Sequence, residues 1–145
     1  MPLTSTPFSA TARGRPFVTV LRPSLPVKPL TLFVTKSAPA GDEHGLLIWG
    51  PAQAGIAAGV ADALADGVIS RDEADSHVII AAVWVNPGAD DAETVFANNR
   101  LSVRTALHNG ALSLPSTDDV IAARNSPTNP FFTPQAQPLD PGSSV

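Results

Sequence analysis

The sequence predicts an α+β fold, a two-layer domain whose elements follow the order β-β-β-α-β-α. Three features carry this prediction: a helix of small residues over 51–67, an almost continuous apolar run over 78–86, and apolar residues at steps of three and four over 90–110. Short β-branched stretches precede all three. With 145 residues, of which 43% are hydrophobic, the chain is long enough to bury one core.

Residues 1–145 are expected to form a single domain with three parts. Residues 1–15 show no apolar period of two or 3.6 residues, which predicts an arm. Residues 16–110 hold the periodic elements and should form the core. Prolines recur throughout residues 111–145 and exclude a further long helix, so an irregular tail is expected there.

Three short strands are predicted ahead of the first helix. Residues 17–21, FVTVL, are β-branched and bounded by prolines, and residues 31–36, TLFVTK, alternate and end on Lys36. Between them, the three prolines of PSLPVKP (23–29) predict a rigid turn. After a loop, residues 46–49 are expected to return as a third strand, so that the three strands form an antiparallel meander.

The helices carry recognisable start and stop signals. The first is expected to begin at Gly50-Pro51 and to end at Gly67, a left-handed cap. A capping box of Ser70 and Glu73 should follow it. The apolar run 78–86 then predicts a central strand covered on both faces, and Asp90 or Asp91 should cap a second helix that ends near residues 109–110.

Two features of these helices allow two explanations each. Gly55 and Gly59 lower the helix propensity of the first helix, which is explained either by close packing against the sheet or a neighbouring subunit, or by a smooth face that leaves room for a ligand. Asn99 is the polar member of an apolar stripe. It is either a buried amide satisfied by backbone or water, or a polar group presented to a cleft.

Composition argues against several classes of function. A net charge of −4, with no cluster of Lys or Arg, argues against a nucleic-acid partner, and the apolar runs are too short to span a membrane. The absence of cysteine excludes disulfides and thiolate metal sites and is typical of a cytoplasmic protein. His44, His77 and His108 lack the spacing of metal ligands, so no metal is expected.

Lys36 and Gln53 are the candidate binding residues that the pattern itself indicates. Both are predicted at the ends of elements, where side chains can be directed toward a shared cleft. The alternative is a solvated surface lysine and an ordinary residue of a first helical turn.

Four stretches of the chain resemble the formaldehyde-activating enzyme family: PSLPVKP, TLFVTK, WGPAQAGIAAGVADALADGVISRDEAD and SPTNPF. The resemblance is ungapped from about Phe17 to Asp75 and looser to about Phe131. It implies a ribosomal protein S5 domain 2-like fold and a homopentamer with clefts between subunits. It also implies the condensation of formaldehyde with tetrahydromethanopterin to methylene-tetrahydromethanopterin, with release of water, in one-carbon metabolism.

The resemblance also implies which residues contact the pterin. Lys36 and Gln53 match the family's lysine and glutamine, whereas Ala38 replaces its threonine and Val18 its leucine. The family's histidine, the proposed proton donor, and a nearby aspartate would fall upstream of Met1. No catalytic residue is therefore assigned, and weak or altered activity is expected.

Two other hypotheses remain open beside this lyase activity. One is a non-catalytic sensor or carrier that binds a pterin or an aldehyde in the same cleft. The other is a structural partner that co-assembles with a full-length paralogue. Independently of these hypotheses, Phe131 and Phe132 are adjacent aromatic residues in an extended tail and are expected to be covered by another copy of the chain, which predicts a closed homo-oligomer.

Overall fold

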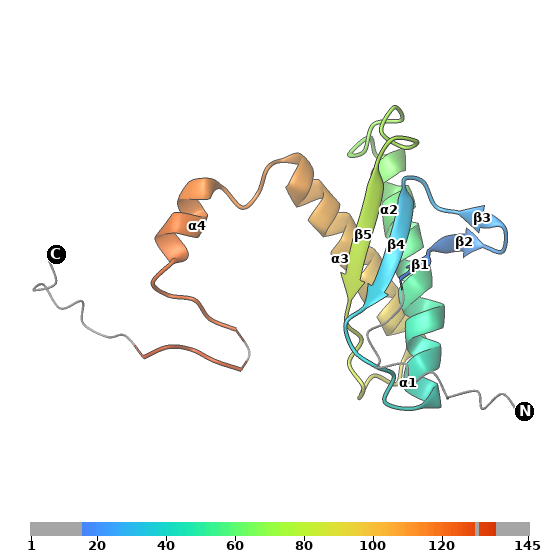
Figure 1. Ribbon diagram of the computed structural model, residues 1–145, viewed down its shortest axis with the longest axis horizontal. Coiled ribbons are helices and arrows are strands. Elements are labelled where there is room, and N and C mark those ends of the chain that lie inside the picture. Colours follow the sequence, from blue (N-terminus) through green and yellow to red (C-terminus); the bar gives the residue numbers. More distant parts are fainter. Residues whose placement is uncertain (1–15, 130, 136–145) are drawn as a thin grey trace, which may run out of the picture. The chain divides into compact units, whose positions relative to one another are not determined.

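The computed structural model describes residues 16–129 and 131–135, in two units that comprise residues 1–112 and 113–145 (Figure 1). The expected arm, residues 1–15, lies outside the described residues. The first unit has a small sheet and a layer of helices, which confirms the predicted α+β two-layer class. No helix in the described part of the chain is long and apolar enough to cross a membrane.

The sheet of the first unit has three strands with β4 (Leu30–Thr35) in the middle. On one side β1 (Phe17–Val18) pairs with it antiparallel, with Phe17 opposite Phe33. On the other side β5 (Val78–Val83) pairs with it parallel. Because β4 and β5 run in the same direction, the helices that connect them must cross back over one face of the sheet.

The first predicted strand is divided between two sheets. Its second half is β2 (Val20–Arg22), which forms a separate antiparallel hairpin with β3 (Leu25–Pro26). The chain reverses at Ser24, whose φ is 65°. The proline-rich stretch is therefore a hairpin, where a turn was expected, and Pro26 is tolerated because a strand of this small ribbon can leave its N–H position unpaired.

The predicted third strand, residues 46–49, is wrong, and with it the antiparallel meander. These residues lie in α1 (Asp42–Leu47) and in the π-helical turn η1 (Ile48–Ala52). The physical reason is a spacing of four: His44, Ile48, Ala52 and Ile56 are all buried, so they form one helical face against the sheet.

The helical segment therefore begins earlier than Gly50-Pro51, at the start of α1. Its long part is α2 (Gln53–Ala65), which continues directly from α1 and η1, and Pro51 lies within the π-helical turn. A wide turn of this kind already departs from the regular hydrogen-bond pattern, so the missing N–H of proline costs less there. The end of the helix is as predicted, because Gly67 adopts a φ of 76°.

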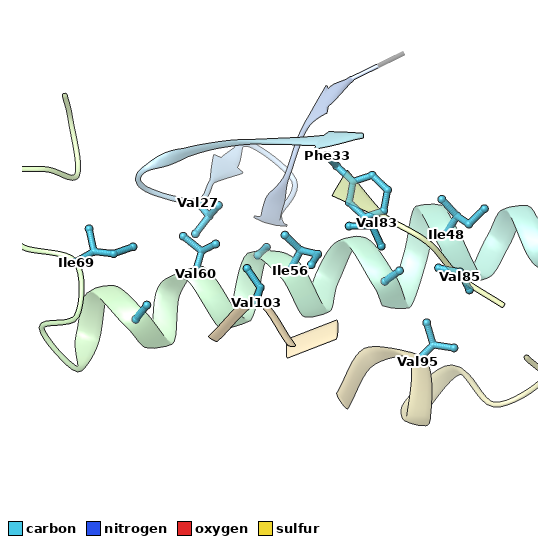
Figure 2. Packing of buried hydrophobic residues seen from close by; sticks show 13 residues of the cluster. Val27, Phe33, Ile48, Ile56, Val60, Ile69, Val83, Val85, Val95 and Val103 are labelled. Atoms are coloured by element: carbon cyan, nitrogen blue, oxygen red, sulfur yellow. The ribbon is translucent and has the colours of Figure 1, made fainter. Parts of the chain in front are cut away.

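Packing between α2 and α3 (Ala92–Ala111) explains the two glycines of α2. A Cβ on Gly55 would lie 2.5 Å from the carbonyl oxygen of Phe96, and one on Gly59 would lie 2.6 Å from that of Arg100. Close packing is thus confirmed, with α3 as the partner in place of the sheet or another subunit. The other face of α2 packs on Phe33 and the neighbouring core residues (Figure 2).

Among the described residues of the first unit, helices cover one face of the sheet and leave the other open. Val83 and Val85 are buried in the core, whereas Val78, Ile80 and Trp84 are 58%, 70% and 59% exposed. The prediction that this strand is central and covered on both faces is therefore wrong: within the described residues β5 is an edge strand. A sheet with a single helical layer leaves its second face open.

The described residues of the second unit include one short helix, α4 (Thr117–Ala123), capped by Ser116. Further along, Asn129 and Phe132 exchange backbone hydrogen bonds of 2.9 and 3.2 Å across a tight turn. The described part of the tail has no long helix, as its prolines predict, although α4 makes it less irregular than expected.

Candidate functional site

Gln53 lies at the first position of α2, and its side chain is used structurally. Its Oε1 accepts a 2.6 Å hydrogen bond from the backbone N–H of Val20. This contact joins the hairpin β2–β3 to the helix and satisfies an N–H that has left the main sheet. The amide Nε2 is the part of Gln53 with which a ligand can still form a hydrogen bond.

Lys36 extends β4 by one residue. Its backbone N–H donates to the carbonyl oxygen of Val83 at 2.8 Å, which continues the parallel pairing with β5. The side chain is exposed and takes part in none of the three ion pairs found among the described residues. Its ammonium group is therefore available to a polar or anionic ligand.

Within one chain Lys36 and Gln53 lie far apart along the sheet. Gln53 is bonded to Val20, and the preceding residue, Thr19, donates to the carbonyl oxygen of Thr31 at 2.9 Å. Lys36 follows five residues beyond Thr31, which amounts to about 17 Å along an extended strand. The structure therefore does not bring the two predicted binding residues into contact with each other.

The other two predicted residues divide between these two places. Ala38 is exposed in the loop two residues beyond Lys36. Val18 belongs to β1 and pairs with Leu32 of β4. It lies two residues before Val20, whose backbone N–H donates to Gln53. We refer to Lys36 and Ala38 as the lysine group and to Val18 and Gln53 as the glutamine group.

Trp49 lies close to the glutamine group, and the sequence patterns do not identify it as a candidate site residue. The Phe17 ring stacks on Phe33 with centroids 4.8 Å apart and meets the indole of Trp49 at 5.0 Å. Trp49 remains half exposed, one helical turn ahead of Gln53. The spacing of four between these two residues is the signal that places them on one helical face, but the apolar run 46–49 by itself predicts a strand.

His44 serves the fold. It is buried, its Nδ1 accepts from the N–H of Ala40 at 2.9 Å, and its Nε2 lies 2.8 Å from the carbonyl oxygen of Val85. Because Nδ1 accepts from an N–H, Nε2 must carry the proton and donate. Both nitrogens are therefore used to hold the loop before α1 on the end of β5. Among the described residues no three His, Cys, Asp or Glu side chains are grouped as a metal site would require.

Asn99 fulfils both explanations offered for it. Its Nδ2 donates to the carbonyl oxygen of Val95 at 2.8 Å, so the amide is satisfied by backbone. It also lines two neighbouring cavities of about 430 and 290 Å³, together with Trp84. The larger cavity lies between β5 and α3 and is mainly apolar, and the smaller one leads toward Asp90 and Asp91.

The charged residues of α2 and α3 bind each other. Arg100 holds Asp62 through two hydrogen bonds of 2.7 and 2.8 Å, and Arg104 lies 3.0 Å from Asp66. The hydrogen bonds from Arg100 lower the pKa of Asp62 below its usual value. Backbone and side-chain hydrogen bonds from Ser70 likewise lower the pKa of Glu73, which confirms the predicted capping box. These carboxylates have structural partners.

Comparison with known proteins gives consistent matches. The family model described as formaldehyde-activating enzyme (Fae) matches residues 6–132. A bifunctional enzyme Fae/Hps of Methanosarcina barkeri is 35% identical over 114 residues, and one of Archaeoglobus fulgidus is 34% identical over 116 residues. These matches cover 79% and 80% of the chain but 29% of each relative.

A shorter relative is matched over a larger share of its length. The 5,6,7,8-tetrahydromethanopterin hydro-lyase of Methanosarcina barkeri is 33% identical over 116 residues, which is 80% of this chain and 65% of that protein. The chain therefore spans less than a third of the bifunctional relatives and about two thirds of this one.

Proposed function

This chain belongs to the formaldehyde-activating enzyme family, and on that premise we propose that it binds a tetrahydropterin and formaldehyde and promotes their condensation. Tetrahydromethanopterin is the proposed substrate because one relative is a tetrahydromethanopterin hydro-lyase. Lys36 and Gln53 are the proposed contacts, since they match the family's lysine and glutamine. A cytoplasmic location is part of the same proposal.

The observation that carries the proposed site is the separation of the lysine group from the glutamine group. About 17 Å along β4 separates the levels of the two groups, which is more than the length of a pterin ring system alone. Contacts from two copies of the chain would let one ring system meet a lysine group and a glutamine group without spanning that distance. We therefore propose a homo-oligomer, a pentamer as in the resemblance, with each pterin site between neighbouring copies.

The proposed chemistry requires positioning above all. Formaldehyde adds to an amine of the pterin, and the resulting carbinolamine loses water as the methylene bridge forms. Residues that hold the two reactants together raise the rate by proximity alone. In this proposal Lys36 donates hydrogen bonds to polar groups of the pterin, and the Nε2 of Gln53 donates to its heterocycle.

The activity is expected to be weak or altered. Ala38 lacks the hydroxyl that the family's threonine offers the pterin, and an unpaired polar group on a buried ligand costs about 1 to 3 kcal/mol. His44 has both ring nitrogens engaged with backbone groups, so it is not a proton donor for the substrate.

The test is a direct assay with the purified protein, formaldehyde and tetrahydromethanopterin. We expect methylene-tetrahydromethanopterin to form faster than in buffer alone and calorimetry to detect pterin binding. Lys36→Ala should weaken both. Lys28→Ala, which removes another exposed lysine paired with Asp75, should weaken neither. The uncatalysed rate together with no detectable binding would contradict the proposal.

The second candidate is a non-catalytic pterin- or aldehyde-binding sensor or carrier. It is supported by the match of Lys36 and Gln53 to the family's pterin contacts, whereas no catalytic residue is assigned and His44 has both ring nitrogens engaged with backbone groups. The same assay separates the two functions. Binding that Lys36→Ala weakens, without any rate above that of buffer, is the outcome that this candidate predicts.

A further inference from the structure

The pairing of β4 with β5 places Trp84 beside Lys36. The two strands run side by side in parallel, with Thr35 opposite Val83 at the end of the ladder (Figure 1). The N–H of Lys36 then donates to the carbonyl oxygen of Val83 at 2.8 Å, which extends the ladder by one step. Lys36 and Trp84 are the next two residues in this register, so they lie opposite each other on strands about 5 Å apart.

Both side chains project from the open face of the sheet. Thr35, Val83 and Val85 are buried, so they face the helices. Because side chains alternate between the two faces of a sheet, Lys36 and Trp84 project from the opposite face. Their exposure agrees with this, since Trp84 is 59% exposed and Lys36 is also exposed. An ammonium group and an indole ring are therefore neighbours on one open surface.

The surface around Trp84 is hollowed. Cavities of about 430 and 290 Å³ both reach this residue. The ring contacts found in the described part of the chain join Phe17 to Phe33 and to Trp49, and none of them uses the indole of Trp84. The indole is therefore not stacked on another described ring and can accept a flat partner.

The chemistry of this pair favours a flat partner with a polar edge over an apolar one. An apolar segment laid over the indole would also take the ammonium of Lys36 out of water without a partner, which is costly. A flat heterocycle that carries acceptors at its rim can stack on the indole and accept from the ammonium at the same time. The pyrimidine ring of a tetrahydropterin has this form, with a carbonyl oxygen and ring nitrogens at its edge.

We propose that Trp84 is a further pterin-binding residue, whose indole stacks on the pterin ring system while Lys36 donates to the polar edge of the same ring. This inference rests on the proposed function and adds to it the residue that recognises the flat face of the substrate. When an aromatic side chain that stacks on a nucleic-acid base is removed, affinity falls roughly 5- to 150-fold. A comparable loss is expected for a pterin.

The first test compares the pterin affinities of variants by calorimetry. Trp84→Leu keeps an apolar side chain but removes the ring, so tetrahydromethanopterin should bind at least about 5-fold more weakly. Trp84→Phe retains a smaller ring and should recover most of that loss. Val78→Ala is the control, because it removes an exposed apolar side chain from the same face of β5, and it should bind the pterin as the unchanged protein does. Circular dichroism establishes that each variant is folded.

The second test uses the fluorescence of Trp84 itself. The chain has two tryptophans, so Trp49→Phe leaves Trp84 as the only one. Saturating tetrahydromethanopterin should remove most of its emission without shortening the lifetime of the remainder, because a stacked indole is quenched in the ground-state complex. A tryptophan that merely supports the fold does not show this static quenching. Position 84 is unchanged in this protein, so the result does not depend on the folding of Trp84→Leu.

The outcomes separate this inference from the proposed function. Equal pterin affinity in Trp84→Leu and the unchanged protein, or binding without static quenching of Trp84, overturns the role of Trp84 and leaves the proposed function standing. An equal loss of affinity in Trp84→Leu and Val78→Ala would show a general effect on the fold and likewise overturns that role. No pterin binding by the unchanged protein overturns both.

Discussion

Gln53 is expected to combine a structural and a binding role that can be separated chemically. Gln53→Glu keeps an oxygen acceptor for the N–H of Val20 but removes the Nε2 donor, whereas Gln53→Ala removes both. We expect Gln53→Ala to lower the free energy of unfolding by about 1 to 3 kcal/mol, because it leaves the N–H of Val20 unpaired. Gln53→Glu should be nearly as stable as the unchanged protein while it weakens pterin binding.

Denaturant unfolding and calorimetry measure the two effects separately. Equal pterin affinity in Gln53→Glu and the unchanged protein would remove Gln53 from the proposed site and leave only its structural role.

Asp62 is the carboxylate for which the structure predicts a pH dependence of stability. Hydrogen bonds from Arg100 lower its pKa in the folded state, so the group stabilises the fold when it is ionised. That stabilisation is present above the unfolded pKa of about 4 and is lost as the pH falls through the lower folded value. Arg100 is partly exposed, so we expect the pair to contribute about 1 kcal/mol after solvent screening.

The measurement is the stability of Asp62→Asn against pH. The variant should be less stable than the unchanged protein at pH 7, and the difference should shrink as the pH falls below about 4. A difference that stays constant down to pH 2 would show that the ionised carboxylate is not its source.

At the residue level the sequence indicates candidate binding residues but not where the fold places them. Lys36 and Gln53 were recognised as candidates from element ends and from the resemblance. Their separation along β4 was not predictable, because it depends on which strands pair and in which register. Sequence spacing carries no such information for strands that are far apart in the chain.

Among the elements, the contact between α2 and α3 is the one most sensitive to volume. Gly59→Ala would place a methyl group against the carbonyl oxygen of Arg100 and the side chain of Val103. We expect the free energy of unfolding to fall by about 1 to 3 kcal/mol, because overpacking outweighs the gain in helix propensity.

Gly110→Ala is the matched control on α3. A Cβ at this glycine has no atom within 4 Å, so the substitution should be neutral or raise stability by up to about 1 kcal/mol. The two variants are compared by chemical denaturation. A Gly59→Ala protein as stable as Gly110→Ala would mean that the helices can move apart without cost.

The helices and strands show why local patterns predict some elements and miss others. The helix α3 and its Asp91 cap were predictable, because a twenty-residue amphipathic stretch has a clear period and start signal. Residues 46–49 form an apolar run of four, which fits a strand as well as a buried helix. Only the longer spacing of His44, Ile48, Ala52 and Ile56 distinguishes the two, and it extends across Pro51.

For the molecule as a whole, the proposed homo-oligomer would account for two features of the first unit. One face of its sheet is open, and its lysine and glutamine groups are separated along β4. In the proposed assembly, neighbouring copies complete both. The apolar run 78–86 suggested burial on both faces, and a partner copy could supply the second cover. The sequence alone does not distinguish cover by the same chain from cover by another.

Pterin binding by mixed oligomers of Lys36→Ala and Gln53→Glu chains tests most directly whether each site is shared between two copies. If each site takes its lysine from one copy and its glutamine from a neighbour, random mixing restores both residues in about one quarter of the sites. Calorimetry should then detect that fraction of sites with the affinity of the unchanged protein, although neither variant alone has it. Mixed oligomers that bind no more pterin than the two variants measured separately would contradict a site shared between copies.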